Sequence, residues 1–200
     1  METYLGIKFN TRRINDAFVY DNRLKELHKW IFILGELGLA PVHPEGAYGN
    51  HSYRLSGDSF IITRTGMTPC RGMSEQDYCQ VSYAEEEDTF LVKGRYEPSS
   101  ESFLHFYIYN RFPEANVIMH GHSSLLNTFA EQLNIVETAE ELPYGTRELA
   151  LSALQVLSAK NSFIILKNHG FVAVGGDIDT TGKMVLYHYG RLVELLRKTT

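Results

Sequence analysis

Three histidines stand at the ends of two short apolar runs, and their spacing suits them to hold a metal ion. His120 and His122 follow the run 117–119, and His169 comes shortly after the run 163–166. In an extended strand the side chains at i and i+2 project to the same side, so His120 and His122 can reach one point. Three neutral imidazoles with a fourth position open to water or substrate are typical of a catalytic zinc site. An isolated His-x-His pair is more often two polar residues at a strand end, so the surrounding motifs must decide.

Hydroxyl side chains open a predicted helix over 101–112, directly before the strand that carries His120. Ser99 and Ser100 precede Glu101 at this helix start, and Pro113 ends the helix. The free backbone N–H groups and positive dipole end of a helix attract an anion, and two hydroxyls add donors suited to a phosphate. Ordinary helix capping by serine explains the same pattern.

Two glycine-containing dipeptides, Gly49-Asn50 and Thr65-Gly66, are further candidates for binding a ligand. Glycine lets a ligand approach the backbone closely, and Asn and Thr offer side-chain hydrogen bonds. Both dipeptides are also common in turns.

Helical and strand patterns alternate irregularly along the chain. Apolar residues recur at helical spacing over 23–39, where Gly38 stops the pattern, and further helices are predicted over 146–160 and from the cap Asp177 to 197. Strands are predicted over 59–63, 78–83, 89–92, 163–167 and 172–174, with the acidic run 85–88 as a solvated turn. Several strands are adjacent in sequence. This order predicts an α/β fold of the α+β type, a three-layer sandwich whose central, mostly antiparallel sheet is flanked by helices.

Composition limits the domain organisation and the classes of partner. The 200 residues, 44% of them hydrophobic, predict one domain over 23–200 preceded by an N-terminal extension over 1–22. A net charge of -5 with scattered basic residues argues against a nucleic-acid partner. No segment approaches the roughly 20 apolar residues of a membrane helix, and no signal peptide is recognisable, so we expect a cytoplasmic protein. Cys70 and Cys79 are expected to be ordinary thiols.

Six motifs, taken in order, resemble the class II aldolase/adducin family and bacterial enzymes that act on fuculose phosphate and ribulose phosphate. They are Gly49-Asn50-His51-Ser52, Ile62-Thr63-Arg64-Thr65-Gly66-Met67, Pro98-Ser99-Ser100-Glu101, the segment 111–122, Tyr144-Gly145-Thr146-Arg147-Glu148-Leu149 and Lys167-Asn168-His169-Gly170. The resemblance implies that His120, His122 and His169 bind the metal and that Glu101 beside it is the catalytic acid/base. It also implies a substrate-phosphate pocket formed by Gly49, Asn50, Thr65, Gly66, Ser99 and Ser100, and a ring-like homotetramer with active sites at subunit boundaries.

Retro-aldol cleavage of a sugar phosphate explains why such residues would be needed together. The reaction leaves negative charge on the oxygens of an enediolate, which Zn²⁺, or Mn²⁺ or Co²⁺ in its place, would stabilise. A carboxylate such as Glu101 could move the proton at the adjacent carbon, for which its pKa should rise towards neutrality through partial burial. The expected substrate is a phosphorylated ketose.

The chain departs from the sugar-phosphate aldolases between His122 and Gly145, where it is shorter and lacks a tyrosine that acts in the neighbouring subunit's site. Related metal sites in the family support 4-epimerisation of a sugar phosphate, dehydration of methylthioribulose phosphate, and decarboxylation. A non-catalytic, adducin-like interaction protein is a further alternative, although that class is expected to lack the metal histidines.

The other histidines are assigned no metal. His105, one turn after Glu101, is expected to be a half-buried helix residue rather than a partner of Glu101. His28, His43, His51 and His188 are expected to have surface or packing roles.

Overall fold

The strands of the protein form one large sheet and one small one. In the computed structural model, which describes residues 6–44 and 46–199, the strands of the large sheet are β1 (Asn10–Asn15), β4 (Gly49–Arg54), β5 (Phe60–Thr63), β6 (Tyr78–Ala84), β7 (Thr89–Lys93), β8 (Val117–Gly121), β9 (Val136–Glu137), β10 (Phe163–Leu166) and β11 (Gly170–Gly175). Their order across the sheet is β1-β7-β6-β5-β4-β8-β11-β10-β9. The short strands β2 (Val42–His43) and β3 (Gly46–Ala47) pair separately.

Antiparallel pairing dominates the large sheet. Only its two edge strands run parallel to their neighbours, β1 beside β7 and β9 beside β10. The six pairs between them are antiparallel. The predicted mostly antiparallel sheet is therefore confirmed for the described residues.

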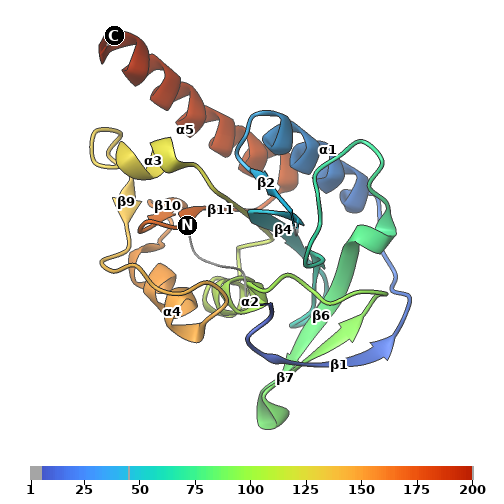
Figure 1. Cartoon of the computed structure of the whole chain (residues 1–200). Helices are drawn as coiled ribbons and strands as arrows, with labels where there is room; N and C mark the ends of the chain where they lie inside the picture. The colour runs from blue at the N-terminus through green and yellow to red at the C-terminus, as the bar shows by residue number, and fades with distance from the viewer. Residues whose placement is uncertain (1–5, 45, 200) are drawn as a thin grey trace.

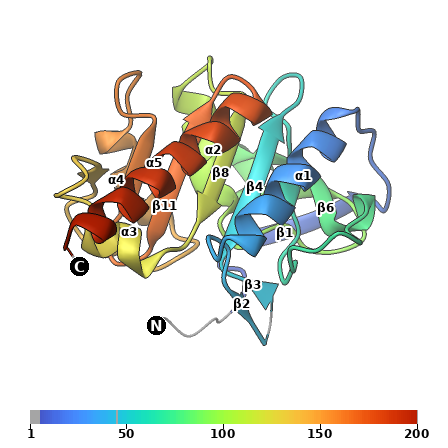
Figure 2. The same ribbon diagram turned by 90° about the horizontal axis from the view of Figure 1, so that it is seen from above.

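Helices cover both faces of the sheet and complete three layers. The helices α1 (Arg23–Glu36), α3 (Ser124–Thr128) and α5 (Ile178–Thr199) lie on one face, and α2 (Ser102–Arg111) and α4 (Arg147–Val156) lie on the other (Figure 1). Figure 2 shows α1 and α5 crossing the strands side by side. Two short 3-10 helices, Glu75–Asp77 and Glu85–Glu87, flank β6, so the predicted acidic turn before β7 is confirmed. None of the helices in the described residues is long and apolar enough to cross a membrane.

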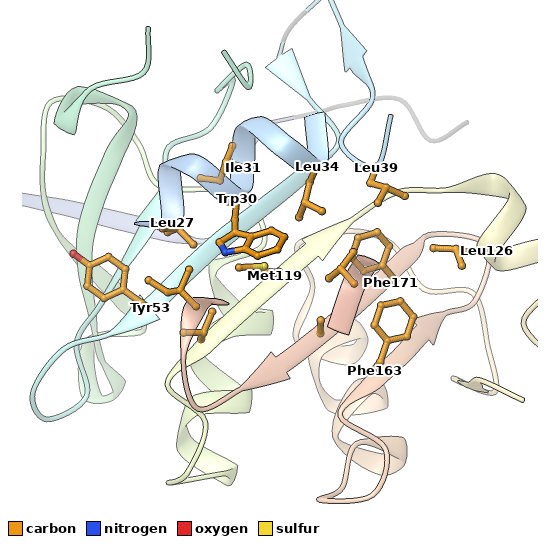
Figure 3. Close-up of a cluster of buried hydrophobic side chains, with 14 of the residues drawn as sticks. Leu27, Trp30, Ile31, Leu34, Leu39, Tyr53, Met119, Leu126, Phe163 and Phe171 are labelled. Atoms are coloured by element: carbon orange, nitrogen blue, oxygen red, sulfur yellow. The ribbon is translucent and has the colours of Figure 1, made fainter. Parts of the chain in front are cut away.

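Helical periodicity places the apolar side of α1 against the centre of the sheet. Trp30 and Leu34, one turn apart, are buried beside Met119 of β8 and Phe171 of β11 (Figure 3). Gly182 of α5 packs so closely on Trp30 that a Cβ there would collide with the indole ring. Burying a large apolar side chain contributes roughly 1.5–3 kcal/mol, so these contacts hold α1 and α5 on the face that they cover.

The sequence did not predict five of the strands, namely β1, β2, β3, β4 and β9, of which β1 and β4 are the longest. The polar residues of β4 show no apolar alternation and favour a turn or a ligand site in the sequence, yet β4 lies between β5 and β8 with hydrogen bonds on both sides. β1 is charged and mostly exposed, and it joins the sheet through its backbone beside β7. Backbone pairing needs no apolar side chain, so neither strand was visible in the hydrophobic pattern.

The N-terminal segment contacts both the sheet and the loop before α4. Within the range 1–22, β1 adds an edge strand, and Arg13 forms an ion pair with Glu97 at 3.2 Å. The Lys8 ammonium donates a hydrogen bond to the Tyr144 carbonyl oxygen at 2.8 Å. Residues 1–5 of this range lie outside the described residues.

Candidate metal centre

Three adjacent elements bring the predicted histidines together. His120 lies on β8, opposite Asn50 of β4 and Val172 of β11, in the middle of the sheet. His122 follows β8 by one residue, and His169 lies in the tight turn between β10 and β11. Because β8 and β11 are neighbours, the turn after β10 reaches the end of β8, and the three imidazoles meet there.

The three histidines and Glu101 each offer one potential ligand atom, and these four atoms lie within 4.8 Å of one another. His120 Nε2 is 3.0 Å from His122 Nε2 and 2.9 Å from Glu101 Oε2. His169 Nε2 is 2.9 Å from Glu101 Oε1. Three nitrogens and a carboxylate at these separations match the ligand set and the edge lengths of a small divalent-cation site.

The tautomer of His120 fits it to bind a cation. Its Nδ1 lies 2.8 Å from the Phe171 carbonyl oxygen, which can only accept a hydrogen bond. In the neutral ring the proton is therefore on Nδ1, and the Nε2 lone pair faces His122 and Glu101. A metal-binding histidine commonly donates its second N–H to a carbonyl in this way. Because a bare nitrogen facing a carboxylate oxygen is repulsive, a cation between them is the natural complement.

Glycines allow the rings to approach. A Cβ on Gly170 would collide with the Gly121 carbonyl oxygen and lie 3.0 Å from both His120 and His122. Gly49 has φ of +140°, and a Cβ there would lie 2.9 Å from the His120 carbonyl oxygen. Any larger residue at these positions would push β4 or the turn before β11 away from the cluster.

Glu101 is buried at the start of α2, which begins one residue later than predicted. It is the N-cap residue, is 4% exposed, and accepts a 2.8 Å hydrogen bond from Asn50 Nδ2. Burial raises its pKa, but His120 and His169 outweigh burial and hold the pKa well below its ordinary value. The rise towards neutrality expected from the sequence was therefore wrong for this arrangement, because positive charge at the neighbouring imidazoles stabilises the carboxylate, as a cation between them also would.

His105 has a more central position than the sequence indicated. The expected half-buried packing role was wrong, because the side chain is fully buried and its Nε2 lies 2.6 Å from Asn50 Oδ1. Asn50 in turn binds Glu101, so His105 is linked to the cluster through one side chain. Helical spacing placed His105 near Glu101, but the partner between them comes from β4.

A cavity of about 780 Å³ opens beside the cluster. All six residues predicted for a phosphate pocket line it, together with Glu101, His122 and His169: Gly49, Asn50, Thr65, Gly66, Ser99 and Ser100. Backbone hydrogen bonds bring the Thr65 and Ser99 segments side by side. The Ser99 N–H donates to the Thr63 carbonyl oxygen at 3.0 Å, and the Thr65 N–H donates to the Glu97 carbonyl oxygen at 2.9 Å. Their roles in binding stay predictions.

Sequence reasoning missed an aromatic wall of this cavity. The Tyr48 ring stacks on His122 with centroids 5.1 Å apart, and the His43 ring packs on Tyr48 at 4.3 Å. Nothing in the local pattern of Tyr48 indicated this contact, which depends on β4 lying beside β8. His51, on the opposite face of β4 from Asn50, is fully buried, and burial lowers its pKa to about 3. It is a neutral packing residue, in line with its predicted role.

Comparisons with known proteins connect this site to a family. The protein-family model described as "Class II Aldolase and Adducin N-terminal domain" matches residues 40–189 of this chain. An L-fuculose phosphate aldolase of Methanococcus maripaludis is 33% identical over 147 residues, which cover 66% of this chain and 76% of that protein. A methylthioribulose-1-phosphate dehydratase of Xylella fastidiosa is 35% identical over 116 residues, 57% of this chain and 50% of that protein.

Solved structures show the same fold. An L-fuculose 1-phosphate aldolase structure superposes with a TM-score of 0.69 at 22% identity, covering 90% of this chain and 88% of that one. A sugar-phosphate aldolase from Thermotoga maritima superposes with a TM-score of 0.68 at 19% identity, covering 89% and 96%. These similarities confirm the predicted fold class. Since the family model spans three quarters of the chain, including all four residues of the cluster, this protein belongs to the class II aldolase/adducin family, whose matched aldolases are lyases.

Proposed function

We propose that this protein is a divalent-metal-dependent lyase that cleaves a phosphorylated ketose by a retro-aldol reaction. The observation that supports this most directly is the convergence of His120, His122, His169 and Glu101 at one end of a cavity lined by hydroxyls and glycines. The similarity to L-fuculose phosphate aldolases supports the same reaction. An adducin-like interaction protein has no need of four convergent ligand groups, two of them buried.

The three histidines would hold the ion, with zinc as the first choice and manganese or cobalt as alternatives. A bound divalent cation supplies Lewis-acid stabilisation of the negative charge that develops on two neighbouring substrate oxygens. His120 can donate its Nε2 lone pair because the Phe171 carbonyl oxygen holds the proton on Nδ1. Tyr48 packs against His122 and would limit the freedom of that ring.

The phosphate would bind at the other end of the cavity. Ser99 and Ser100 lie just before α2, and Gly66 with φ of +65° leaves its backbone accessible opposite them. The Ser99 Oγ accepts a 3.3 Å hydrogen bond from the Glu101 N–H, so its own hydrogen is available to a phosphate oxygen. Fixing both ends of the substrate orients the scissile carbon–carbon bond.

Glu101 would carry the proton. It lies between the histidines and the phosphate pocket, where it could take or return a proton at the carbon next to the metal-bound end of the substrate. Its carboxylate accepts a hydrogen bond from Asn50 and lies 2.9 Å from the nitrogens of His120 and His169 that would hold the ion, so the transfer needs little rearrangement.

Dehydration is the second candidate reaction, because a methylthioribulose-1-phosphate dehydratase is also similar to this chain. A panel of ketose phosphates distinguishes the candidates by product mass. For a ketose 1-phosphate we expect cleavage into dihydroxyacetone phosphate and an aldehyde. A product lighter by one water would assign a dehydratase, and an isomer of unchanged mass an epimerase. Turnover of unphosphorylated sugars alone would contradict the phosphate pocket. If the purified protein holds no metal and turns over none of the sugars, the adducin-like alternative is favoured.

We further propose that the protein is a homotetramer in the cytoplasm, as the family resemblance and the sequence indicate. A closed ring would repeat one interface and bring subunit boundaries close to the sites. Light scattering at micromolar concentration should give about four times the chain mass of 22.8 kDa. A mass near 22.8 kDa would mean that the site is completed within one chain.

A further inference from the structure

We propose that a buried chain of hydrogen bonds running from Tyr109 through Ser52, His105 and Asn50 to Glu101 has one fixed direction and aims the Glu101 carboxylate. Tyr109, Ser52, His105 and Asn50 would thus be positioning residues. Their effect on turnover rests on the proposed function of Glu101, whereas the direction of the hydrogen bonds does not.

A strand and a helix of matching repeat build this chain. Asn50 and Ser52 are two residues apart on one face of β4, about 6.6 Å along the strand. Glu101, His105 and Tyr109 are four residues apart on one side of α2, about 6 Å of helix rise per step. The two rows therefore interdigitate, each strand residue lying between two helix residues.

Every link in the chain is short and buried. Asn50 Nδ2 is 2.8 Å from Glu101 Oε2, and Asn50 Oδ1 is 2.6 Å from His105 Nε2. His105 Nδ1 is 2.6 Å from Ser52 Oγ, which is 2.7 Å from the Tyr109 hydroxyl. Ser52 and His105 are fully buried, and the other three residues are 4% exposed. No water can therefore replace the link between Ser52 and His105 without opening the core, whereas Asn50 and Glu101 also line the cavity.

The direction of the hydrogen bonds follows from Glu101. A carboxylate can only accept, so the amide NH₂ of Asn50 must face Glu101 and its oxygen must face His105. His105 then donates from Nε2. Burial lowers the pKa of His105 to about 3, so the ring is neutral and carries only this one proton. Its Nδ1 must accept from the Ser52 hydroxyl, and the Ser52 oxygen then accepts from Tyr109.

One fixed direction prevents the Asn50 amide from turning over. A turned amide would set its oxygen against the carboxylate, leaving Glu101 Oε2 without the Asn50 donor at roughly 1–3 kcal/mol, and would force His105 into its other tautomer. Asn50 therefore holds Glu101 Oε2 in place while His169 Nε2 lies 2.9 Å from the other oxygen. Asn50 also lines the cavity, and its second amide hydrogen remains for a substrate oxygen.

Two substitutions of His105 test the two ends of the hydrogen-bond chain separately. In His105→Gln the amide nitrogen can take the place of Nε2 and still donate to Asn50, whereas in His105→Asn the shorter amide reaches Ser52 only. We expect His105→Asn to lower kcat about 10–100-fold with KM nearly unchanged, as for loss of a group that orients a site residue. His105→Gln should stay within about fivefold of the unaltered protein. Both should keep their metal and their fold, with a lower melting temperature in His105→Asn because it leaves the buried Asn50 oxygen without a donor, and His28→Gln, at a partly exposed histidine that does not line the cavity, is the matched control.

Equal losses in His105→Gln and His105→Asn, or no loss in either, would overturn the proposal. Neutron diffraction from crystals of the unaltered, zinc-loaded protein gives a test that needs no substrate and no variant. We expect deuterium on His105 Nε2, none on Nδ1, and the Asn50 ND₂ group towards Glu101. Deuterium on Nδ1 would disprove the direction. If no ketose phosphate is turned over, the proposed function fails, but the neutron map still tests the direction of the hydrogen bonds.

Discussion

Replacing His122 with alanine is expected to abolish stoichiometric metal binding at neutral pH. The unaltered protein should retain about one divalent ion per chain, held by His120, His122 and His169. His122→Ala removes one of three nitrogens that lie in a buried cluster, and the remaining two imidazoles and Glu101 cannot restore the lost bond without moving the ends of β8 and β11. Plasma mass spectrometry after dialysis against a weak chelator measures the metal content directly.

The matched control is His188→Ala. His188 is half-buried on α5, stacked on Phe163 at 4.0 Å, on the face of the sheet covered by α1 and α5. It should keep the full metal content, with a lower melting temperature from lost packing. Full metal content in His122→Ala would remove His122 from the site. Loss of metal in both variants would indicate unfolding rather than loss of a ligand, and circular dichroism distinguishes these outcomes.

Glu101→Gln should separate metal binding from turnover. The amide keeps the shape of the side chain and can still accept from Asn50, but it cannot take a proton. The rate should therefore fall by about 10²–10⁴, the loss typical of a missing general acid/base. Metal content should stay near that of the unaltered protein, because the three imidazoles remain. Steady-state kinetics on the ketose phosphate found by the panel, with metal analysis of the same samples, gives both values.

Glu194→Gln provides the control for this substitution. Glu194 is exposed on α5 and pairs only with Lys198, four residues along the same helix, at 2.9 Å among the described residues. Its replacement should leave both rate and metal unchanged. A normal rate in Glu101→Gln would show that another group carries the proton. Loss of metal in Glu101→Gln would make Glu101 a ligand that the site needs.

Local sequence patterns determined all the α-helices of the described residues except α3, the strands with apolar runs, and the candidate metal ligands. The apolar repeat of α1 predicts its buried side, and the apolar run before His120 predicts β8, because each depends only on residues close in sequence. The alternation of a strand likewise puts His120 and His122 on one side. The chemistry of imidazole then indicates a metal. The family resemblance added the role of Glu101 and joined the two serines and the two glycine dipeptides into one phosphate pocket, whereas the local patterns also fit ordinary helix caps and turns.

Only the tertiary structure decided which of these elements face one another. Asn50 lies 51 residues from Glu101 and 55 from His105, and it binds both because β4 runs beside β8 under α2. The burial of His105 and the low pKa of Glu101 follow from these distant contacts. A sequence repeat shows which residues share the face of one element, but it contains no information on which face of another element they will meet. Here the contacts of Asn50 with Glu101 and His105 depend on the backbone pairing of the polar strand β4 with β5 and β8.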